Sequence, residues 1–400
     1  KSKVKLYRIV LKWEQFIVKY PGGNHMAIIK KESFGKLSDG REVSLYTLRN
    51  TKGTEVKVTN YGARLVSWRF FGKDAKQVDI VLGYADALAY EKDDTSMGGV
   101  VGRHANRIAG GKAVINGQEY QLDLNTGSKM QNHIHGGSKG FHNELWEAKE
   151  VYEGVRLTYH SKDGDAGYPG NMDVTVIYSL SNDNELSIKY EAVSDKDTIC
   201  NLTNHSYFNL DGFESPSILD QKIQIFADKY TWADSESLPD GRILDVEGTP
   251  MDLRQPTKIG AHIDDDFDEL VMGRGYDHNW VIREEPVSVE MKPGMFGYDP
   301  HCPIDYLKGG LKKVAYAESD NSGLTLTCYS TLPGVQFYTG NFLEGGLPGK
   351  KGVEFTKRSG FCLETQYFPN ALANPNFPQP IIKAGEKWES QTIFVLWPKD

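Results

Sequence analysis

The chain lacks paired cysteines, a membrane-length apolar run and an extended basic cluster. It has only four cysteines among 400 residues, and no two of them form a CxxC pair: Cys200, Cys302, Cys328 and Cys362. A chain of this size builds a core without disulfides, so we expect free thiols in a reducing, cytoplasmic compartment. No stretch of about 18 uncharged apolar residues is present, and no transmembrane helix is predicted.

Charge argues against a nucleic-acid or membrane partner. The formal net charge is -8, and basic residues are prominent only within residues 1–12. Neither nucleic acid nor a membrane surface is therefore expected as a partner. Lys12, Glu14 and Lys19 interrupt the apolar part of the N-terminal segment, and no clean cleavage site follows, so we do not expect a signal peptide.

The common nucleotide, zinc-protease and serine-nucleophile motifs are also missing. The sequence contains no GxSxG, Walker A, GxGxxG or HExxH, so it gives no sign of the reactions that use them. The acidic run at 264–269 does not have the spacing of a calcium loop. We interpret it as the solvent-exposed start of a helix.

What the sequence does contain is a long series of short β-like segments. They are rich in Val, Ile, Thr, Tyr and Leu, several alternate with period two, and Gly- and Asn-rich turns such as Asn116-Gly117 separate them. One short helix is predicted at 86–91. The pattern predicts an all-β protein, a large antiparallel β-sandwich with few short helices. Predicted strands include 42–48, 55–59, 78–82, 113–115, 155–159, 174–180, 185–190, 222–226, 324–329, 335–338, 361–365 and 392–396.

The strand pattern begins only after the first part of the chain. We interpret residues 1–27 as an N-terminal extension or an expression remnant, because they carry no motif. Residues 28–400 are predicted to form a single domain, since no linker interrupts them and no repeat is visible. Within that domain, the irregular segment 284–313 contains Pro and Gly and is predicted to be an inserted loop.

The stretch NLTNHSYFNLD, residues 201–211, mixes polar and aromatic residues unusually closely. A solvated loop would not need Tyr207 and Phe208 side by side, and a plain core strand would not carry so many polar residues. We interpret the stretch as a strand whose polar face lines a pocket. A single histidine on a strand is more often structural, but the polar neighbours of His205 make a functional role about as plausible.

An HxH pattern occurs at His133 and His135, followed by Gly136-Gly137. On a strand, both imidazoles would lie on one face, which is a metal geometry in some β-barrels. The carboxylate expected four or five residues later is missing, and the first one is Glu144. We therefore predict no metal site. The alternative is that one histidine binds a ligand while the other is structural.

The segment GRHANRI, residues 102–108, places Asn106 between Arg103 and Arg107. Two guanidinium groups and an amide suit a polar ligand with several oxygen atoms. The alternative is that both arginines are structural and are held by carboxylates.

Three further polar residues lie in strand-like or turn-like segments. Asp277 follows Tyr276 in YDHN, where the alternative is an ordinary turn. Gln336 lies in PGVQFY and offers an amide donor and acceptor. Glu364 follows an apolar run, where burial of a carboxylate is costly unless it is paired or functional, and would raise its pKa towards the range of a general base. The alternative for Glu364 is a surface salt bridge.

Six motifs together resemble the aldose 1-epimerase, or galactose mutarotase, family. The resemblance runs from about residue 34 to the C-terminus, and it implies a galactose mutarotase-like supersandwich without a metal or cofactor. It also implies that Glu364 is the catalytic base, His205 the catalytic acid and His135 a second active-site histidine. The motifs, in the order of the family, are GRHANRI at 102–108, HGG at 135–137, NLTNHSYFNL at 201–210, YDHN at 276–279, PGVQFYTGN at 333–341 and FCLETQ at 361–366.

By the same resemblance, Asn106, Arg107, Asp277 and Gln336 match substrate-binding positions. The implied reaction interconverts the α and β anomers of aldohexoses such as D-galactose and D-glucose by acid/base ring opening and reclosure. His104 departs from the tyrosine or valine frequent in the family, and the longer N-terminal segment and inserted loop leave the substrate range open.

Three other functions stay open at this point. One is a non-catalytic carbohydrate-binding protein on the same sandwich, and another is a glycoside hydrolase that uses Glu364 and Asp277 as its carboxylate pair. The third is a metal-dependent enzyme built on the HxH pattern. The expected partner is a small-molecule aldose sugar, and the chain is expected to be a monomer or homodimer.

Overall fold

The structure is a computed structural model, which describes residues 27–152, 154–284 and 310–399. Nearly all of the predicted extension 1–27 and most of the predicted loop 284–313 lie outside these residues, as does Cys302. Strands dominate the described chain, and two short α-helices accompany them. The all-β prediction is therefore confirmed, while the division into an extension and one domain stays a prediction.

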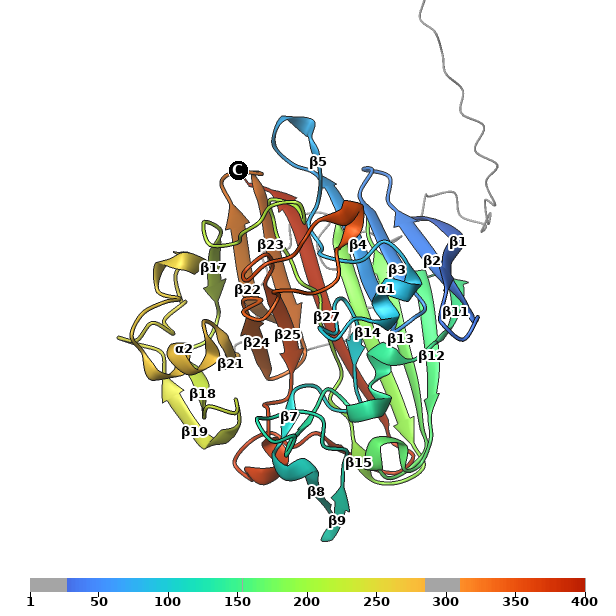
Figure 1. The fold of residues 1–400 in the computed structure, drawn as a ribbon, viewed down its shortest axis with the longest axis vertical. Coiled ribbons are helices and arrows are strands. Elements are labelled where there is room, and N and C mark those ends of the chain that lie inside the picture. Colours follow the sequence, from blue (N-terminus) through green and yellow to red (C-terminus); the bar gives the residue numbers. More distant parts are fainter. Residues whose placement is uncertain (1–26, 153, 285–309, 400) are drawn as a thin grey trace, which may run out of the picture.

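The largest sheet has nine strands and spans the molecule (Figure 1). In the hairpin of its third and fourth strands, Val176 pairs with Tyr190 and Tyr178 with Ile188. These side chains are buried on one face because side chains alternate along a strand. The strands, in spatial order, are β11 (Glu147–Val151), β12 (Gly154–Ser161), β13 (Met172–Leu180), β14 (Glu185–Ser194), β27 (Lys387–Pro398), β23 (Leu324–Ser330), β22 (Lys312–Ser319), β17 (Lys222–Ile225) and β20 (Thr257–Lys258).

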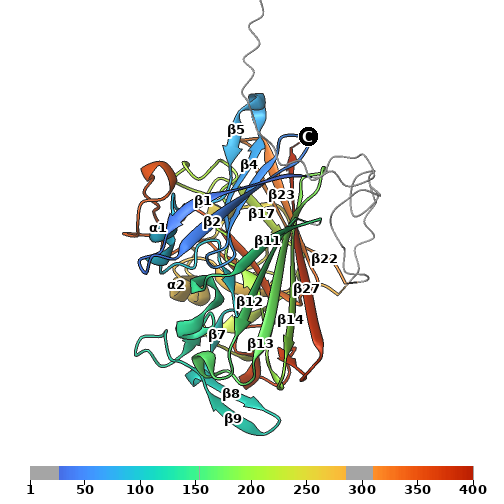
Figure 2. The ribbon, with the colours of Figure 1, turned by 90° about the vertical axis from the view of Figure 1, so that its right-hand side faces the viewer.

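A five-stranded sheet from the first part of the chain packs against one half of this large sheet, as the side view shows (Figure 2). Its buried Trp68 belongs to the same hydrophobic cluster as Tyr178 and Ile188 of the large sheet. This shared core makes the two sheets a sandwich. The strands, in order, are β1 (Ile28–Lys36), β2 (Glu42–Arg49), β3 (Glu55–Thr59), β4 (Arg64–Phe71) and β5 (Gln77–Asp79).

A second five-stranded sheet packs on the other half of the large sheet. Its last strand is tied to β27 by a 2.6 Å hydrogen bond between the hydroxyls of Thr365 and Thr392. Trp280 and Phe337 of this sheet belong to the same hydrophobic cluster as the other two sheets. The strands, in order, are β19 (Pro239–Asp245), β18 (Lys229–Ala233), β21 (Asp277–Val281), β24 (Gly334–Tyr338) and β25 (Cys362–Gln366).

Short strand pairs connect these layers. In one pair the predicted turn Asn116-Gly117 is a two-residue hairpin in which both residues have positive φ, 50° and 81°. That is the backbone of a type I′ turn, which Asn-Gly favours. The pairs are β6 (Val100–Val101) with β16 (Thr203–Asn204), β7 (Arg107–Ile108) with β10 (His133–Ile134), β8 (Lys112–Ile115) with β9 (Gln118–Gln121), and β15 (Thr198–Ile199) with β26 (Ile381–Ile382).

Both short helices lie where the sequence indicates them. Helix α1 (Ala87–Glu91) is capped by Asp86, whose carboxylate accepts from the Ala89 N–H at 2.9 Å. Helix α2 (Asp268–Gly273) begins within the acidic run, with Asp268 and Glu269 in its first turn. No helix of the described chain is long and apolar enough to cross a membrane. The 3₁₀ helices are η1 (Lys73–Ala75), η2 (Ala109–Gly111), η3 (Gly137–Lys139), η4 (Phe141–Asn143), η5 (Asp165–Gly167), η6 (Ile259–Ala261), η7 (Lys350–Gly352) and η8 (Ala371–Ala373).

The prediction of one strand over 201–211 is wrong for most of its length. Only Thr203–Asn204 form a regular strand there. The backbone of the stretch changes partner every few residues, since His205 bonds to the backbone of Gly98 and Gly99 whereas Phe208 bonds to Phe361. The segment therefore lies buried between several neighbours instead of forming one edge of a sheet.

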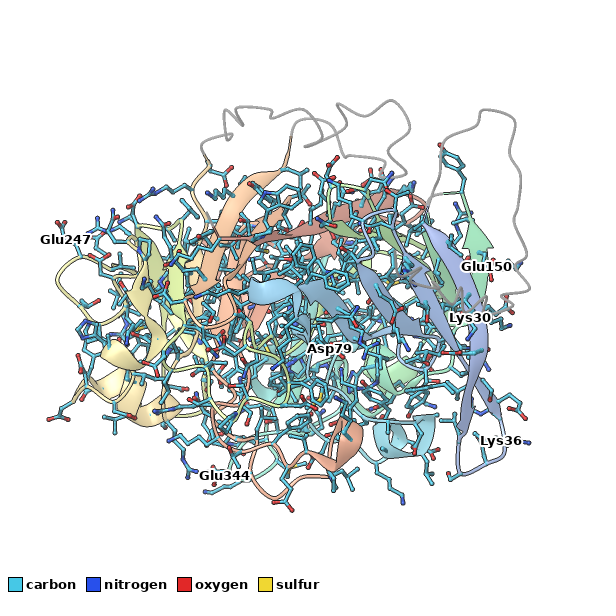
Figure 3. All side chains as sticks on the ribbon, turned by 90° about the horizontal axis from the view of Figure 1, so that it is seen from above. Lys30, Lys36, Asp79, Glu150, Glu247 and Glu344 are labelled. Atoms are coloured by element: carbon cyan, nitrogen blue, oxygen red, sulfur yellow. The ribbon has the colours of Figure 1, made fainter. Side chains whose placement is uncertain are left out.

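A largely buried ion pair fixes the segment that follows β24. Lys350 Nζ donates to Asp79 Oδ2 at 2.7 Å and to the carbonyl oxygens of Val66 and Val81. Seen from above, Asp79 lies toward the middle of the molecule, whereas Lys30 and Glu247 lie near its margins (Figure 3). The loop between β24 and β25 is thus attached to the first five-stranded sheet.

Candidate active site

The second five-stranded sheet presents one polar face, and strand register puts its groups in rows. Asn279 of β21, Gln336 of β24 and Glu364 of β25 are direct neighbours across three strands. Asp277, Tyr338 and Cys362 form the adjacent row. Positions two apart share a face, so both rows point the same way. The alternate positions, among them Trp280 and Phe337, face the hydrophobic core.

His205 faces Glu364 from the buried stretch 201–211. Its Nε2 lies 3.5 Å from Glu364 Oε1, and both side chains are almost fully buried. Glu364 Oε2 has no hydrogen-bond partner among the described residues. An unpaired buried carboxylate oxygen is costly for stability, which is typical of a group kept for chemistry.

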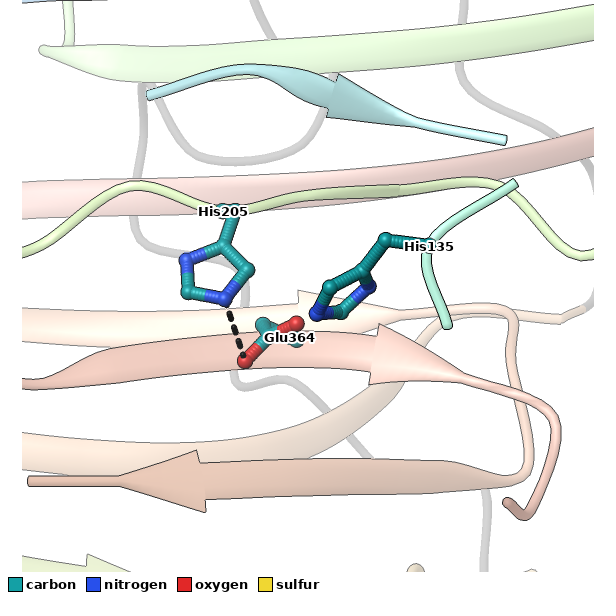
Figure 4. A group of neighbouring side chains, drawn as sticks. All are labelled: His135, His205 and Glu364. Carbon is teal, nitrogen blue, oxygen red and sulfur yellow. Dashed lines mark ion pairs between the residues drawn. The ribbon is translucent and has the colours of Figure 1, made fainter. Parts of the chain in front are cut away.

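His135 completes the group from a third segment (Figure 4). Its ring packs edge-on against that of His205, with centroids 5.3 Å apart. The Asn106 backbone N–H donates to His135 Nδ1 at 3.2 Å. In the neutral ring the proton is therefore on Nε2, and His135 is a hydrogen-bond donor towards the other two residues.

These residues lie at a cavity of about 600 Å³. Of the seven site residues indicated by the sequence, six line it, and the seventh, Gln336, donates to Asp277 Oδ1 at 2.7 Å from the neighbouring strand β24. Among the described residues, no hydrogen bond or ion pair holds the Arg107 guanidinium, so its donors remain available to a ligand. The lining consists of Asp93, Asp94, Thr95, Ser96, Asn106, Arg107, Asn125, Thr126, Ile134, His135, Gly137, His142, Asn143, His205, Tyr207, Asp277, Tyr338, Phe342, Leu343 and Glu364.

Burial controls the protonation of the central pair. It raises the pKa of Glu364 well above the usual value, an effect that Asp277 strengthens and Arg107 opposes. It also lowers the pKa of His205 to about 4. Both shifts favour the uncharged group because a low-dielectric site penalises charge. Of the forms that the pair can take, the site therefore favours the neutral one, with a proton on Glu364 and no charge on His205.

Within the described chain, one group of side chains has the composition of a metal site. Ligand atoms of His135, His205 and Glu364 lie within 4.8 Å of one another. A histidine that binds a metal through one nitrogen donates an N–H from the other. His135 Nδ1 instead faces the N–H donor of Asn106. This hydrogen bond at His135 does not fit the pattern of a metal-bound histidine.

The HxH pattern does not put two imidazoles on one face. Strand β10 ends at Ile134, and His135 has a φ of +53°. His133 instead contacts the Tyr168 hydroxyl at 2.6 Å and the carbonyl oxygen of Asp123 at 2.8 Å, away from the cavity. The alternative of one ligand-facing and one structural histidine describes this geometry.

The two arginines of residues 102–108 have different surroundings. Arg103 is buried and donates to the carbonyl oxygens of Pro169, Ser161 and Lys162, so it is structural. It is held by carbonyl groups, not by the carboxylates expected from the sequence. Arg107 alone lines the cavity.

Sequence reasoning missed one side of the cavity. Residues 93–96 and 142–143 come from separate segments, and neither carries a local pattern that indicates a ligand. Asp93 is paired with buried Arg64 at 2.9 Å, so its charge is compensated. Tyr207, which also lines the cavity, lies two residues from His205, and that spacing was the available signal for it.

Comparison with known proteins identifies the family of the chain. The sequence model of the family described as Aldose 1-epimerase matches residues 44–395. The galactose mutarotase of Rattus norvegicus is 39% identical over 370 residues, 92% of this chain and 98% of its own. That of Homo sapiens is 37% identical over 372 residues, 92% and 98% of the two chains. The solved structure of galactose 1-epimerase from Lactobacillus acidophilus is 27% identical, with a TM-score of 0.75, and the match covers 94% of this chain and 100% of that chain. This chain belongs to the aldose 1-epimerase family.

Proposed function

We propose that this chain is an aldose 1-epimerase that interconverts the α and β anomers of aldohexoses such as D-galactose and D-glucose. The observation that carries the proposal is the buried pair His205–Glu364, 3.5 Å apart, at a cavity lined by hydrogen-bonding groups. The names of the relatives, galactose mutarotase among them, support the choice of galactose.

The reaction needs one base and one acid. Glu364 as carboxylate takes the proton of the C1 hydroxyl, and the C1–ring-oxygen bond breaks. Protonated His205 gives its Nε2 proton to that ring oxygen, which leaves an open-chain aldehyde. Rotation about C1–C2 and the reverse transfers close the ring on the other face. No proton is gained or lost over the cycle.

Burial of His205 and Glu364 affects the energetics of the ring-opening step. The ring-opening step converts a charged carboxylate and imidazolium into a neutral acid and a neutral imidazole. The pKa of Glu364 is raised and that of His205 lowered, so the site favours the neutral pair. Desolvation therefore favours the proton transfers that open the ring.

The remaining polar groups suit the sugar hydroxyls. Arg107 and His135 are donors, whereas Asp277 accepts and is oriented by Gln336. Asn106 lines the cavity, and its backbone N–H and Oδ1 bond to His135 Nδ1 and to the Arg107 N–H, so its side-chain NH₂ is the group left for a sugar hydroxyl. We assign substrate binding to Asn106, Arg107, His135 and Asp277, and orientation of Asp277 to Gln336.

Arg107→Ala is expected to raise KM and also lower kcat, for a loss of about 10- to 100-fold in kcat/KM. Arg107 binds hydroxyl groups, and its charge lowers the pKa of Glu364, so its removal leaves less carboxylate. Steady-state polarimetry over a range of galactose concentrations measures both constants. The matched control is Arg242→Ala, an exposed arginine over Trp232. If Arg107→Ala kept the KM and kcat of the parent, the assignment of Arg107 to substrate binding would be wrong.

The pH profile of kcat/KM is expected to fall on the acid side near pH 4. Because the pKa of His205 is lowered to about 4, the pair keeps one proton down to that pH and takes a second only below it. A doubly protonated pair has no base, so kcat/KM falls about tenfold per pH unit below the limb. Polarimetry corrected for spontaneous mutarotation measures this, with near-UV circular dichroism as the check on folding. A limb near the ordinary histidine value of about 6.5 would contradict the proposed burial effect.

The function itself is tested by polarimetry on freshly dissolved α-D-galactose, α-D-glucose and α-maltose with a chelator present. Acceleration of mutarotation supports the epimerase and shows that no chelatable metal is needed. Release of reducing sugar from a glycoside would favour the hydrolase instead. If the folded protein bound sugar but did not accelerate mutarotation, the result would favour a non-catalytic carbohydrate-binding protein.

We also infer a reducing, cytoplasmic location and a monomer or homodimer. The three described cysteines are unpaired, which supports the compartment. The cavity described above is built within one chain, so a monomer would be sufficient for the chemistry.

A further inference from the structure

The imidazole of His205 lies between two side chains of one strand. Its Nε2 faces Glu364 Oε1 at 3.5 Å, and its Nδ1 faces the sulfur of Cys362 at 3.6 Å. Cys362 and Glu364 are two positions apart in β25, so they share a face of that strand. One strand therefore contacts both ring nitrogens of the proposed acid.

The other aromatic neighbours of the ring make no hydrogen bond to His205 Nδ1 among the described residues. Tyr207, His135 and Tyr338 pack around His205, with ring centroids 5.1, 5.3 and 6.3 Å away. The Tyr207 hydroxyl donates to the Thr95 carbonyl oxygen, and the Tyr338 hydroxyl accepts from the Phe342 N–H. Among the described side chains, Cys362 is the hydrogen-bond partner of His205 Nδ1.

A partner at Nδ1 decides which ring nitrogen exchanges the proton. An imidazole has two neutral tautomers, and the hydrogen bond at one nitrogen selects the role of the other. For His205 to give and take a proton at Nε2, Nδ1 must keep its own N–H throughout the cycle. That N–H lies in a buried site and needs an acceptor, because an unpaired buried donor is costly.

We propose that Cys362 is a positioning residue whose sulfur accepts the Nδ1–H of His205 and leaves Nε2 as the nitrogen that exchanges the proton. The proposal rests on the proposed role of His205 as catalytic acid and adds the group that orients it. Sulfur is a weak acceptor, and 3.6 Å is within its longer bonding range.

The sulfur also remains uncharged. Burial, with the nearby charges of Glu364 and Asp277, raises the pKa of the Cys362 thiol well above its usual value. A carboxylate in the same place would stabilise the imidazolium and make His205 a weaker acid. A neutral thiol fixes the tautomer without that cost in acidity.

The test compares three replacements of Cys362 in the full chain. Cys362→Ala and Cys362→Val remove the acceptor, and valine also keeps most of the volume. Both are expected to lower kcat about 10- to 100-fold with KM changed less than about threefold. Cys362→Ser keeps an acceptor and is expected to lose less than about fivefold. The control is Cys328→Ala, a buried cysteine of β23 away from the cavity, expected to keep the parent kcat.

A second measurement reads the tautomer directly. Long-range ¹H–¹⁵N spectra of the histidine side chains, with His205 assigned by its absence in His205→Gln, should show the Nδ1–H form in the parent and in Cys362→Ser. In Cys362→Ala and Cys362→Val the population should move towards Nε2–H. An unchanged tautomer with unchanged kcat in folded Cys362→Val overturns the proposal, as does a serine variant as slow as valine. A parent chain without epimerase activity would refute the proposed function, and the spectra would still decide on the hydrogen bond.

Discussion

Glu364→Gln is expected to lower kcat about 10³-fold while leaving the chain folded, because the amide cannot take the proton of the C1 hydroxyl. Glutamine keeps the shape of glutamate and can still contact a sugar hydroxyl, so KM should change little. The strand register that places residue 364 beside Gln336 does not depend on the charge. The loss should therefore appear in kcat and not in binding.

The thermal stability of Glu364→Gln distinguishes a loss of the catalytic base from a loss of folding. Glu364 is buried, and its Oε2 has no hydrogen-bond partner among the described residues. Removing a buried acid under these conditions should leave Tm unchanged or raise it. The matched control is Glu269→Gln. Glu269 is a buried glutamate that accepts a hydrogen bond from the Tyr230 hydroxyl, so this variant should lose stability and keep the parent kcat. Near-parent turnover in folded Glu364→Gln would reject the base assignment.

His205→Gln is expected to lower kcat by about 10²- to 10³-fold, since the ring oxygen then has no proton donor in place. Glutamine fills much of the histidine volume but cannot donate a proton to a leaving oxygen. The open cavity and the sugar-binding groups should persist, so galactose binding measured by calorimetry should change by less than about tenfold. Loss of turnover with retained binding is the expected signature of a missing acid.

His133→Gln is the control for this variant. His133 is equally buried, but its ring contacts Tyr168 and the Asp123 carbonyl oxygen and not the cavity. This control should lower Tm and leave kcat within severalfold of the parent. If His205→Gln kept parent turnover, or if both histidine variants failed equally with intact folding, the assignment of the acid to His205 would be wrong.

Enrichment in β-branched and aromatic residues, with alternation in several segments, made the long strands predictable. Strand β3 coincides with its predicted range, 55–59, and β13 and β14 only extend theirs, because one face of each meets the core. Strands of two residues such as β6 and β16 have no period to detect. The predicted strand at 78–82 is displaced for a similar reason, since β5 ends at Asp79.

The proposed site was predictable where a residue belongs to a dense local motif. His205 and Glu364 each lie among unusual neighbours, and the cavity joins them. Gln336 was predictable as a polar residue but not as a support for Asp277, because that depends on cross-strand register. His142 and Asp93 enter the cavity only through tertiary packing, which no local pattern encodes.

The paired backbones of Phe208 and Phe361 have a consequence for how such a protein diverges. Each donates its N–H to the carbonyl oxygen of the other, at 2.7 and 2.9 Å, three positions from His205 and from Glu364. These backbone bonds help to set the spacing of the two proposed reacting groups, and they do not involve the side chains that line the cavity. Mutations there, at Phe342 for example, can alter which sugars are accepted while the reaction is inherited unchanged.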